Sequence, residues 1–277
     1  MQEDANCLLE NYEKIKTSAE FSALVSAYEE QGAAFDFSPA LQRLKSISVS
    51  VGVHEYTAAM LYFLCLTREW RRLCACQKID DDVWHDSAMD LKYKLWECKA
   101  VKGVVGTFVG AWFPRFFKLE RFALGRLQFE TIVLGEECRL NGKVLSSGTT
   151  VLNVHIPRTG MRLIYEEVCE AYQKARVFFR QKFAFETPAF VCHSWLLYPL
   201  HQKMLSNDSN ILKFINDYTL VKTGQYDNYS ELWRLFDCEI KEDFGLLPQD
   251  TSLRREYVSL MLRKEKSGWG FGVHMCI

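Results

Sequence analysis

One stretch of the chain decides its fold class: residues 149–183, which read TTVLNVHIPRTGMRLIYEEVCEAYQKARVFFRQKF. Its opening, TTVLNVHI, is rich in β-branched and apolar side chains and predicts a well-buried strand over 149–156. Apolar residues then recur at helical spacing, which predicts a long amphipathic helix after the loop Pro157–Gly160. A further apolar run, FVCHSWLL at 190–197, predicts a second strand. This order predicts a crossover unit whose two strands are adjacent and parallel.

The chain before this unit has a different character. Apolar side chains recur at helical spacing over 20–30, 55–76 and 84–98, and acidic residues at 80–82 are typical of a helix start. A further apolar helix is predicted over Val104–Leu119. The first 120 residues are therefore expected to form a helical domain.

The pattern changes near Arg121. Residues 127–134 are apolar and favour a strand, Asn141-Gly142 favours a hairpin turn, and Trp269–Met275 alternates as a last strand. Two helices with polar caps are expected after 208–209 and after 250–251. The sequence thus predicts an α/β (α+β) protein, with a helical domain over 1–120 and a mixed-sheet domain over 121–277.

Composition excludes several classes of protein. Of 277 residues, 48% are hydrophobic and 25% charged, which is typical of a globular chain rather than a disordered one. With 34 basic and 35 acidic residues, the net charge of -1 gives no positive field for nucleic acid or a membrane surface. Ten cysteines are spread along the chain, and the start carries acids rather than a secretion signal. We expect a cytoplasmic protein with reduced thiols.

Several longer motifs, taken together and in order, resemble a bacterial family of two-domain, acyltransferase-like proteins. In that family a helical N-acyltransferase N-terminal domain precedes a GNAT-like C-terminal domain. The resemblance covers roughly residues 50–277. The motifs are WECKAVKGVVGTFVGAWF (96–113), RFALGRLQFE (121–130), VLNVHIP (151–157), ARVFF (175–179), CHSWLLYP (192–199) and LSNDSNILKF (205–214).

The resemblance implies a function and a place for the donor. GNAT proteins transfer an acyl group from acyl-coenzyme A to an amine, so the expected partners are an acyl donor and an amine acceptor, both small molecules. The loop before the helix would hold the coenzyme A pyrophosphate, because free amides at a helix N-terminus favour an anion. That loop supplies Arg158, Thr159, Gly160, Met161 and Arg162. It has a single glycine and begins with Pro157, whereas GNAT loops usually carry two glycines.

The resemblance also implies that the central strand splays from the next one. The gap would admit the thioester, and a strand amide near Val154 would polarise its carbonyl. Acyl transfer to an amine needs a base, for which His155 and Glu130 are candidates, and an acid, for which Tyr218 is the candidate. Cys192 is an alternative nucleophile. Its neighbour His193 points to the other face of the strand, so Cys192 would need a distant partner such as His155.

Two other readings stay open at this point. In one, the GNAT-like fold is a scaffold that binds a ligand or partner without chemistry; in the other, Cys192 makes the protein a thiol hydrolase. Cys74, Cys76, His85 and Cys98 offer zinc-type ligands, but no CxxC pair supports a site, so no metal is expected. The sequence does not specify the acyl group, the acceptor or the oligomeric state.

Overall fold

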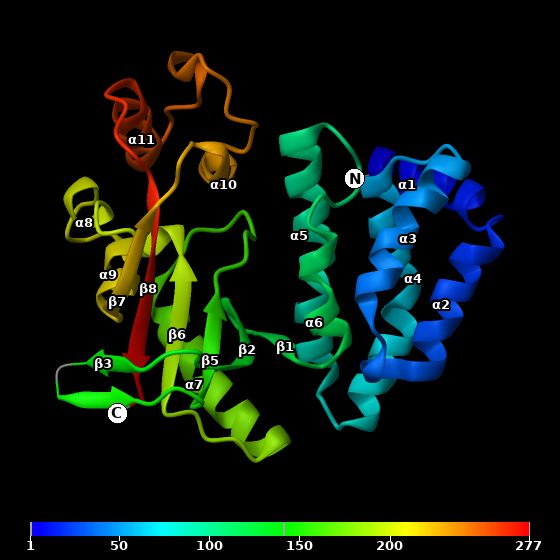
Figure 1. Cartoon of the computed structure of the whole chain (residues 1–277), viewed down its shortest axis with the longest axis horizontal. Helices are drawn as coiled ribbons and strands as arrows, with labels where there is room; N and C mark the ends of the chain where they lie inside the picture. The colour runs from blue at the N-terminus through cyan, green and yellow to red at the C-terminus, as the bar shows by residue number, and fades with distance from the viewer. Residues whose placement is uncertain (1, 141, 277) are drawn as a thin grey trace. The chain divides into compact units, whose positions relative to one another are not determined.

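The computed structural model describes residues 2–140 and 142–276, and its contacts divide the chain into two compact units (Figure 1). The first unit is Met1–Ala123 and the second is Leu124–Ile277. The first contains helices and short 3-10 turns, whereas nearly all of the sheet lies in the second. The helical bounds in the first unit are α1 (Gln2–Ile15), α2 (Ala19–Gln31), α3 (Phe37–Ser50), α4 (Glu55–Cys76), α5 (Asp81–Lys102) and α6 (Pro114–Phe117).

Local signals fix the ends of α5, one of two 22-residue helices in the first unit. α5 begins after Asp80, and its first turn carries Asp81 and Asp82, whose charges suit the unpaired amides there. It ends at Gly103, which adopts φ 68° and can do so because it has no Cβ. The unit packs around buried aromatic rings: Phe63 and Trp70 of α4 lie 5.1 and 4.6 Å, centroid to centroid, from Phe117 of α6.

The helix predicted over Val104–Leu119 is wrong. The chain forms a 3-10 turn at Gly110–Trp112 and the short α6, with irregular backbone before them. The reason is a close backbone approach: a Cβ on Gly106 would lie 2.4 Å from the carbonyl of Tyr56. Thr107 N donates to Tyr56 O at 2.9 Å, which fastens the segment to the start of α4. Apolar composition alone did not reveal this tertiary constraint.

The second unit is built on a six-stranded sheet with the order β1-β2-β5-β6-β8-β7. β5 and β6 are parallel, and β2–β5, β6–β8 and β7–β8 pair antiparallel. The helix α7 (Tyr165–Phe183) joins β5 to β6, so the predicted crossover unit is present. The strand bounds are β1 (Arg121–Leu124), β2 (Leu127–Val133), β3 (Cys138–Leu140), β4 (Lys143–Leu145), β5 (Thr150–His155), β6 (Ala189–Ser194), β7 (Thr219–Gln225) and β8 (Gly268–Met275).

Both faces of the sheet are partly covered. On one face, Tyr172 of α7 packs against Phe129 of β2 and Phe190 of β6, with ring centroids 6.3 and 4.8 Å apart. On the other, the β3–β4 hairpin buries Cys138 and Leu140 against Val191 and neighbouring strand residues. The predicted turn residue Asn141 lies outside the described residues. The remaining helices are α8 (His201–Met204), α9 (Asn210–Asn216), α10 (Trp233–Phe236) and α11 (Ser252–Leu262).

Two details of the second unit differ from the prediction. β6 stops at Ser194, whose Oγ accepts a hydrogen bond from Leu196 N at 3.2 Å and starts a 3-10 turn instead of a longer strand. β7, which the sequence analysis did not identify, pairs with β8, so the last strand of the chain lies between β6 and β7. Gly270 of β8 is required because a Cβ there would lie 2.3 Å from Leu197 O in that turn.

Candidate functional site

The parallel ladder between β5 and β6 is short. It pairs Leu152 with Phe190 and Asn153 with Val191. β5 nevertheless continues to His155, where it still pairs with β2, and β6 continues to Ser194, where it pairs with β8. Among the described residues the ladder between β5 and β6 holds no further pair, so regular pairing of the two strands ends at Asn153 and Val191. This unpaired end of the ladder, which we call the β5–β6 gap, is where the sequence resemblance places the thioester.

The two predicted bases lie together at one edge of the gap. Register places Glu130 of β2 directly opposite Asn153 of β5, and His155 follows two residues later on the same face. Glu130 Oε1 lies 2.9 Å from His155 Nε2 and 3.0 Å from Asn153 Nδ2. The side chain of Glu130 is only 5% exposed and that of His155 is 21% exposed. The strands therefore assemble a largely buried cluster, Glu130–Asn153–His155, in which the His155 ring is more exposed than the Glu130 carboxylate.

The tautomer of His155 depends on the charge of Glu130. Asn153 Nδ2 donates to Glu130 Oε1 and also lies 3.1 Å from His155 Nε2, which is 2.9 Å from the same carboxylate oxygen. An ionised carboxylate only accepts hydrogen bonds, so with Glu130 ionised Nε2 carries the ring proton and the basic lone pair of the ring is on Nδ1. The carboxylate also stabilises the positive charge that the ring gains on taking a proton. This is the arrangement of a base held and strengthened by a buried acid.

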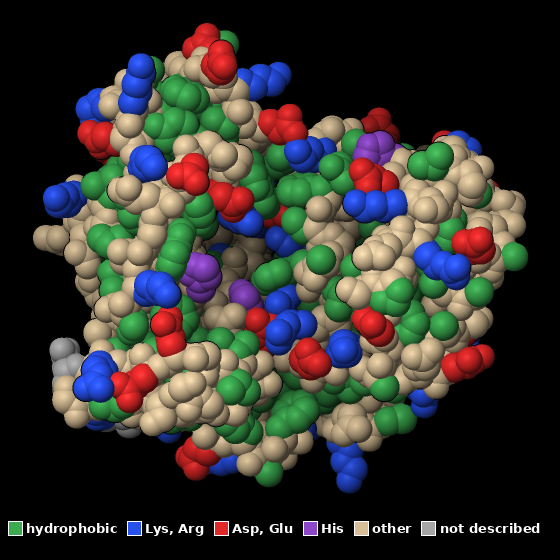
Figure 2. All heavy atoms as spheres, in the orientation of Figure 1, with side chains coloured by type: hydrophobic (Ala, Val, Ile, Leu, Met, Phe, Trp, Pro, Cys, Tyr) green, Lys and Arg blue, Asp and Glu red, His purple; other side chains and the backbone are tan. Residues whose placement is uncertain are grey.

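Asn153 was not singled out by the sequence analysis. It is two residues before His155, so strand alternation alone places both on one face. His193 lies two residues after Val191, and Val191 pairs with Asn153, so His193 lies on the same face at the other edge of the gap. Figure 2 shows histidine side chains over these strands on the face of the molecule that it draws.

The other two candidates on the sheet, Val154 and Cys192, belong to the opposite face. Val154 pairs with Phe129 and is buried. Cys192 follows Phe190 at a step of two, is fully buried, and has a pKa raised to about 12 by the loss of solvation. Since His155 points to the first face, it cannot serve as the partner of Cys192. The buried, protonated thiol gives no support to the thiol hydrolase reading.

Tyr218 lies just before β7, and its hydroxyl is 2.9 Å from that of Tyr172 in α7. Burial raises the pKa of Tyr218 well above its usual range, so the hydroxyl keeps its proton. His274 of β8 packs on both tyrosine rings, with centroids 5.0 and 5.9 Å away. Tyr172 and His274 are additional residues of this face that the sequence analysis did not identify.

The predicted phosphate loop precedes α7 and is held by hydrogen bonds from Arg126, a residue that the sequence analysis did not identify. Arg126, in the turn between β1 and β2, donates to Pro157 O at 3.0 Å and to Met161 O at 3.5 Å. Thr159 Oγ1 accepts from Met161 N at 3.2 Å, and Gly160 adopts φ 79°. The loop is thus shaped by its own hydrogen bonds and by one arginine.

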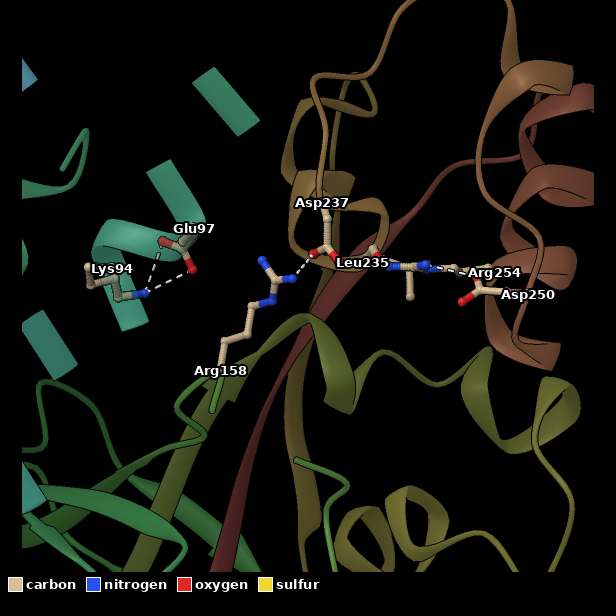
Figure 3. Close-up of polar contacts among 7 residues, drawn as sticks. All are labelled: Lys94, Glu97, Arg158, Leu235, Asp237, Asp250 and Arg254. Atoms are coloured by element: carbon tan, nitrogen blue, oxygen red, sulfur yellow. Dashed lines mark hydrogen bonds and ion pairs between the residues drawn. The ribbon is translucent and has the colours of Figure 1, made fainter. Parts of the chain in front are cut away.

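The cations of this loop differ in their surroundings. Arg162 is exposed. Arg158 makes an ion pair of 2.6 Å with Asp237, and the same carboxylate accepts from Arg254 at 2.9 Å (Figure 3). Arg254 is fixed in turn by Leu235 O and by Asp250. An anion that recruits Arg158 must therefore compete with Asp237.

The first turn of α7 carries Glu166 and Glu167, both exposed. Their charges oppose an anion at this helix end, so the positive charge needed there must come from the loop arginines. No group of His, Cys, Asp or Glu suited to a metal ion occurs among residues 2–140 and 142–276. None of the helices in that part of the chain is long and apolar enough to cross a membrane.

Comparison with known proteins identifies the family. The GNAT-like C-terminal domain matches residues 122–274, and the N-acyltransferase N-terminal domain matches residues 1–119. The chain belongs to the family that joins these two domains, as the sequence motifs indicated. The predicted fold class, a helical N-terminal part followed by a GNAT-like mixed-sheet part, is confirmed. No curated protein matches the sequence.

Several solved structures are similar. An acyltransferase in complex with decanoyl-CoA is 25% identical, with a TM-score of 0.66 over 79% of this chain and 66% of that one. An acyltransferase in complex with decanoyl-CoA and teicoplanin is 22% identical, with a TM-score of 0.69 over 96% of this chain and 86% of that one. The chain thus spans slightly less than two thirds of the first of these proteins, and the second shows likeness of fold alone.

Proposed function

We propose that this protein transfers an acyl group from acyl-coenzyme A to an amine. The observation that carries the proposal is the β5–β6 gap with the Glu130–Asn153–His155 cluster at its edge, in a chain of this family. A thioester in the gap would lie beside a base, which is the minimum that the reaction needs. Related acyltransferases that bind decanoyl-CoA support the choice of donor.

The reaction requires an uncharged amine and a place for one proton. The amine nitrogen attacks the thioester carbonyl carbon, the C–N bond forms, and the C–S bond then breaks to release coenzyme A as a thiolate. His155 Nδ1 takes the proton that the nitrogen loses, and Glu130 stabilises the resulting imidazolium through Nε2. That proton then leaves to solvent, and the thiolate takes one from solvent, so protons and electrons balance.

The opposite face of the gap would serve the leaving group. Tyr218 keeps its proton and can donate a hydrogen bond to the departing sulfur, in partnership with Tyr172. A backbone amide near Val154, beyond the last ladder pair with β6, would polarise the carbonyl. In the loop, Arg158, Thr159, Gly160, Met161 and Arg162 would bind the pyrophosphate. Cys192 has no role in this scheme because its thiol is buried and protonated.

The test is isothermal titration with coenzyme A and acetyl-coenzyme A, followed by turnover with a panel of primary amines that includes an amino sugar and a diamine. Saturable binding, together with the formation of an N-acyl product seen by mass spectrometry, is expected. An absence of binding to well-folded protein would overturn the proposal. His155→Ala should lower the turnover number far more than the affinity for the donor.

Two observations favour a second candidate, a GNAT-like protein that binds a ligand without chemistry. Arg158 is engaged by Asp237, and Glu166 and Glu167 occupy the helix end where a pyrophosphate would lie. Binding of coenzyme A without any transfer to the amine panel, and with no effect of His155→Ala, would favour this alternative over the enzyme.

A further inference from the structure

A cavity of about 400 Å³ opens on the same face of the sheet as the Glu130–Asn153–His155 cluster. We call it the β6–β8–β7 pocket. The strand register shows which face the pocket occupies. Phe271 of β8 pairs with His193 of β6, and His193 lies on the same face of the sheet as Val191 and Asn153. Its main lining residues are Leu134, Gly135, Cys138, His193, Trp269 and Phe271.

The walls of this pocket are mostly apolar. Leu134 and Cys138 belong to the buried core beneath the β3–β4 hairpin, and the half-buried Phe271 packs on that core. The ring of Trp269 meets that of His193 edge to face, 4.5 Å between centroids. Burial lowers the pKa of His193, so its ring is neutral near neutral pH and compatible with an apolar occupant.

Charge in the pocket is confined to one ion pair. Lys222 Nζ lies 3.2 Å from Glu136 Oε1, and both side chains are well exposed. The two charges neutralise each other, so the pocket offers an ionic ligand no net attraction. Its aromatic and aliphatic surface instead favours a hydrocarbon group, whose transfer from water is favourable.

The pocket begins where the gap ends. His193, at its near side, is two residues beyond Val191, the last residue of β6 that pairs with β5. The Glu130–Asn153–His155 cluster lies on the β2–β5 edge of the same gap. A group held in the gap therefore has the base on one side and the apolar pocket on the other.

We infer that the β6–β8–β7 pocket binds the hydrocarbon chain of the acyl donor and makes the protein selective for medium-length acyl groups over acetyl. The inference rests on the proposed function, which places the thioester in the gap. The amine must approach from the side of the base, so the acyl chain is directed to the other side. Three neighbouring strands span about 10 Å at their usual spacing, which suits a chain longer than acetyl.

Gly135 offers a clean way to close the pocket. A Cβ at this position meets no atom within 4 Å, and its φ is not positive, so Gly135→Phe adds bulk to the pocket lining without backbone strain. Val144→Phe is the matched control: it adds a ring on the β3–β4 hairpin that follows Gly135, at a residue that is 52% exposed and does not line the pocket.

The experiment is isothermal titration of coenzyme A and of acetyl-, butyryl-, hexanoyl- and octanoyl-coenzyme A against the full chain and both variants. In the unmodified protein and in Val144→Phe, affinity should rise by up to about fourfold for each added methylene that is buried. Gly135→Phe should lose this rise and bind acetyl-coenzyme A unchanged.

The outcomes separate the two proposals. If no thioester binds, the proposed function fails. If acetyl-coenzyme A binds but affinity is independent of chain length, or if Gly135→Phe keeps the full rise, the pocket does not hold the acyl chain while the proposed function stands. Thermal melting checks that each variant is folded. In folded Gly135→Phe, an affinity that does not change with acyl chain length means that the pocket is blocked.

Discussion

Replacing Glu130 by glutamine tests the assembled base most sharply. The substitution keeps the shape of the side chain and an oxygen that can accept from His155 and Asn153, but it removes the negative charge. Glu130 is almost fully buried, with its Oε1 2.9 Å from His155 Nε2. In such a site the charge stabilises the imidazolium formed when the amine loses its proton.

The size of the effect follows from those contacts. A hydrogen bond to a charged group contributes about 1.5–3 kcal/mol, and general base catalysis contributes about 10²–10⁴ in rate. His155 remains in place, so we expect Glu130→Gln to lower the turnover number about 100- to 1,000-fold, or about 3–4 kcal/mol of barrier. Donor affinity and the melting temperature should change little, because glutamine fits the same space.

The assay is product formation by mass spectrometry, with octanoyl-coenzyme A and the most reactive amine of the panel. Glu265→Gln, a carboxylate that pairs with Arg263 on the surface, is the control and should leave turnover unchanged. In the double variant with His155→Gln, the loss should not exceed that of the worse single variant, because the two residues act as a unit. Turnover within threefold of the unmodified protein for Glu130→Gln would refute this reasoning.

Three further outcomes are expected. Iodoacetamide at pH 8 should leave Cys192 unmodified in folded protein while it labels the exposed Cys76, because a thiol of pKa about 12 is ionised in roughly one molecule in ten thousand; rapid labelling of Cys192 would be inconsistent with its burial. Gly106→Ala should lower the free energy of unfolding by about 3 kcal/mol in a urea titration, because its Cβ would lie 2.4 Å from the α4 backbone; an unchanged midpoint would contradict that contact. Asp237→Asn should tighten coenzyme A binding about two- to fivefold in calorimetry, because asparagine tolerates φ 62° and releases Arg158 from a half-exposed ion pair; weaker binding would mean that Asp237 positions Arg158 instead.

Local signals carried the prediction of the crossover unit and the long helices. The strand at 149–156, the amphipathic helix predicted after the loop Pro157–Gly160 and the helix that begins after Asp80 correspond closely to β5, α7 and α5. Their apolar periodicity and caps act within a few residues of each other, so they can be read in the sequence. The false helix over Val104–Leu119 has the opposite origin, because the approach of Gly106 to the backbone of Tyr56 joins distant parts of the chain.

In the candidate site, too, the sequence predicts what nearby residues determine and not what contacts between distant residues determine. His155 and Glu130 were each selected as possible bases, but only the β2–β5 register brings them into contact. Asn153 could have been predicted from the sequence, because strand alternation places it on the same face as His155. Arg126 and Asp237 could not have been predicted, because each contacts the phosphate loop from an element remote in the chain. The pocket also depends on β7, which the sequence pattern did not reveal.

Hydrogen exchange with and without octanoyl-coenzyme A tests the central claim, that the donor lies in the β5–β6 gap. Backbone amides in peptides covering 152–164 and 190–196 should be protected when the donor is bound. A control peptide covering α11, Ser252–Leu262, should exchange at the same rate in both states. Saturable binding with no protection in either of the first two peptides would contradict the account.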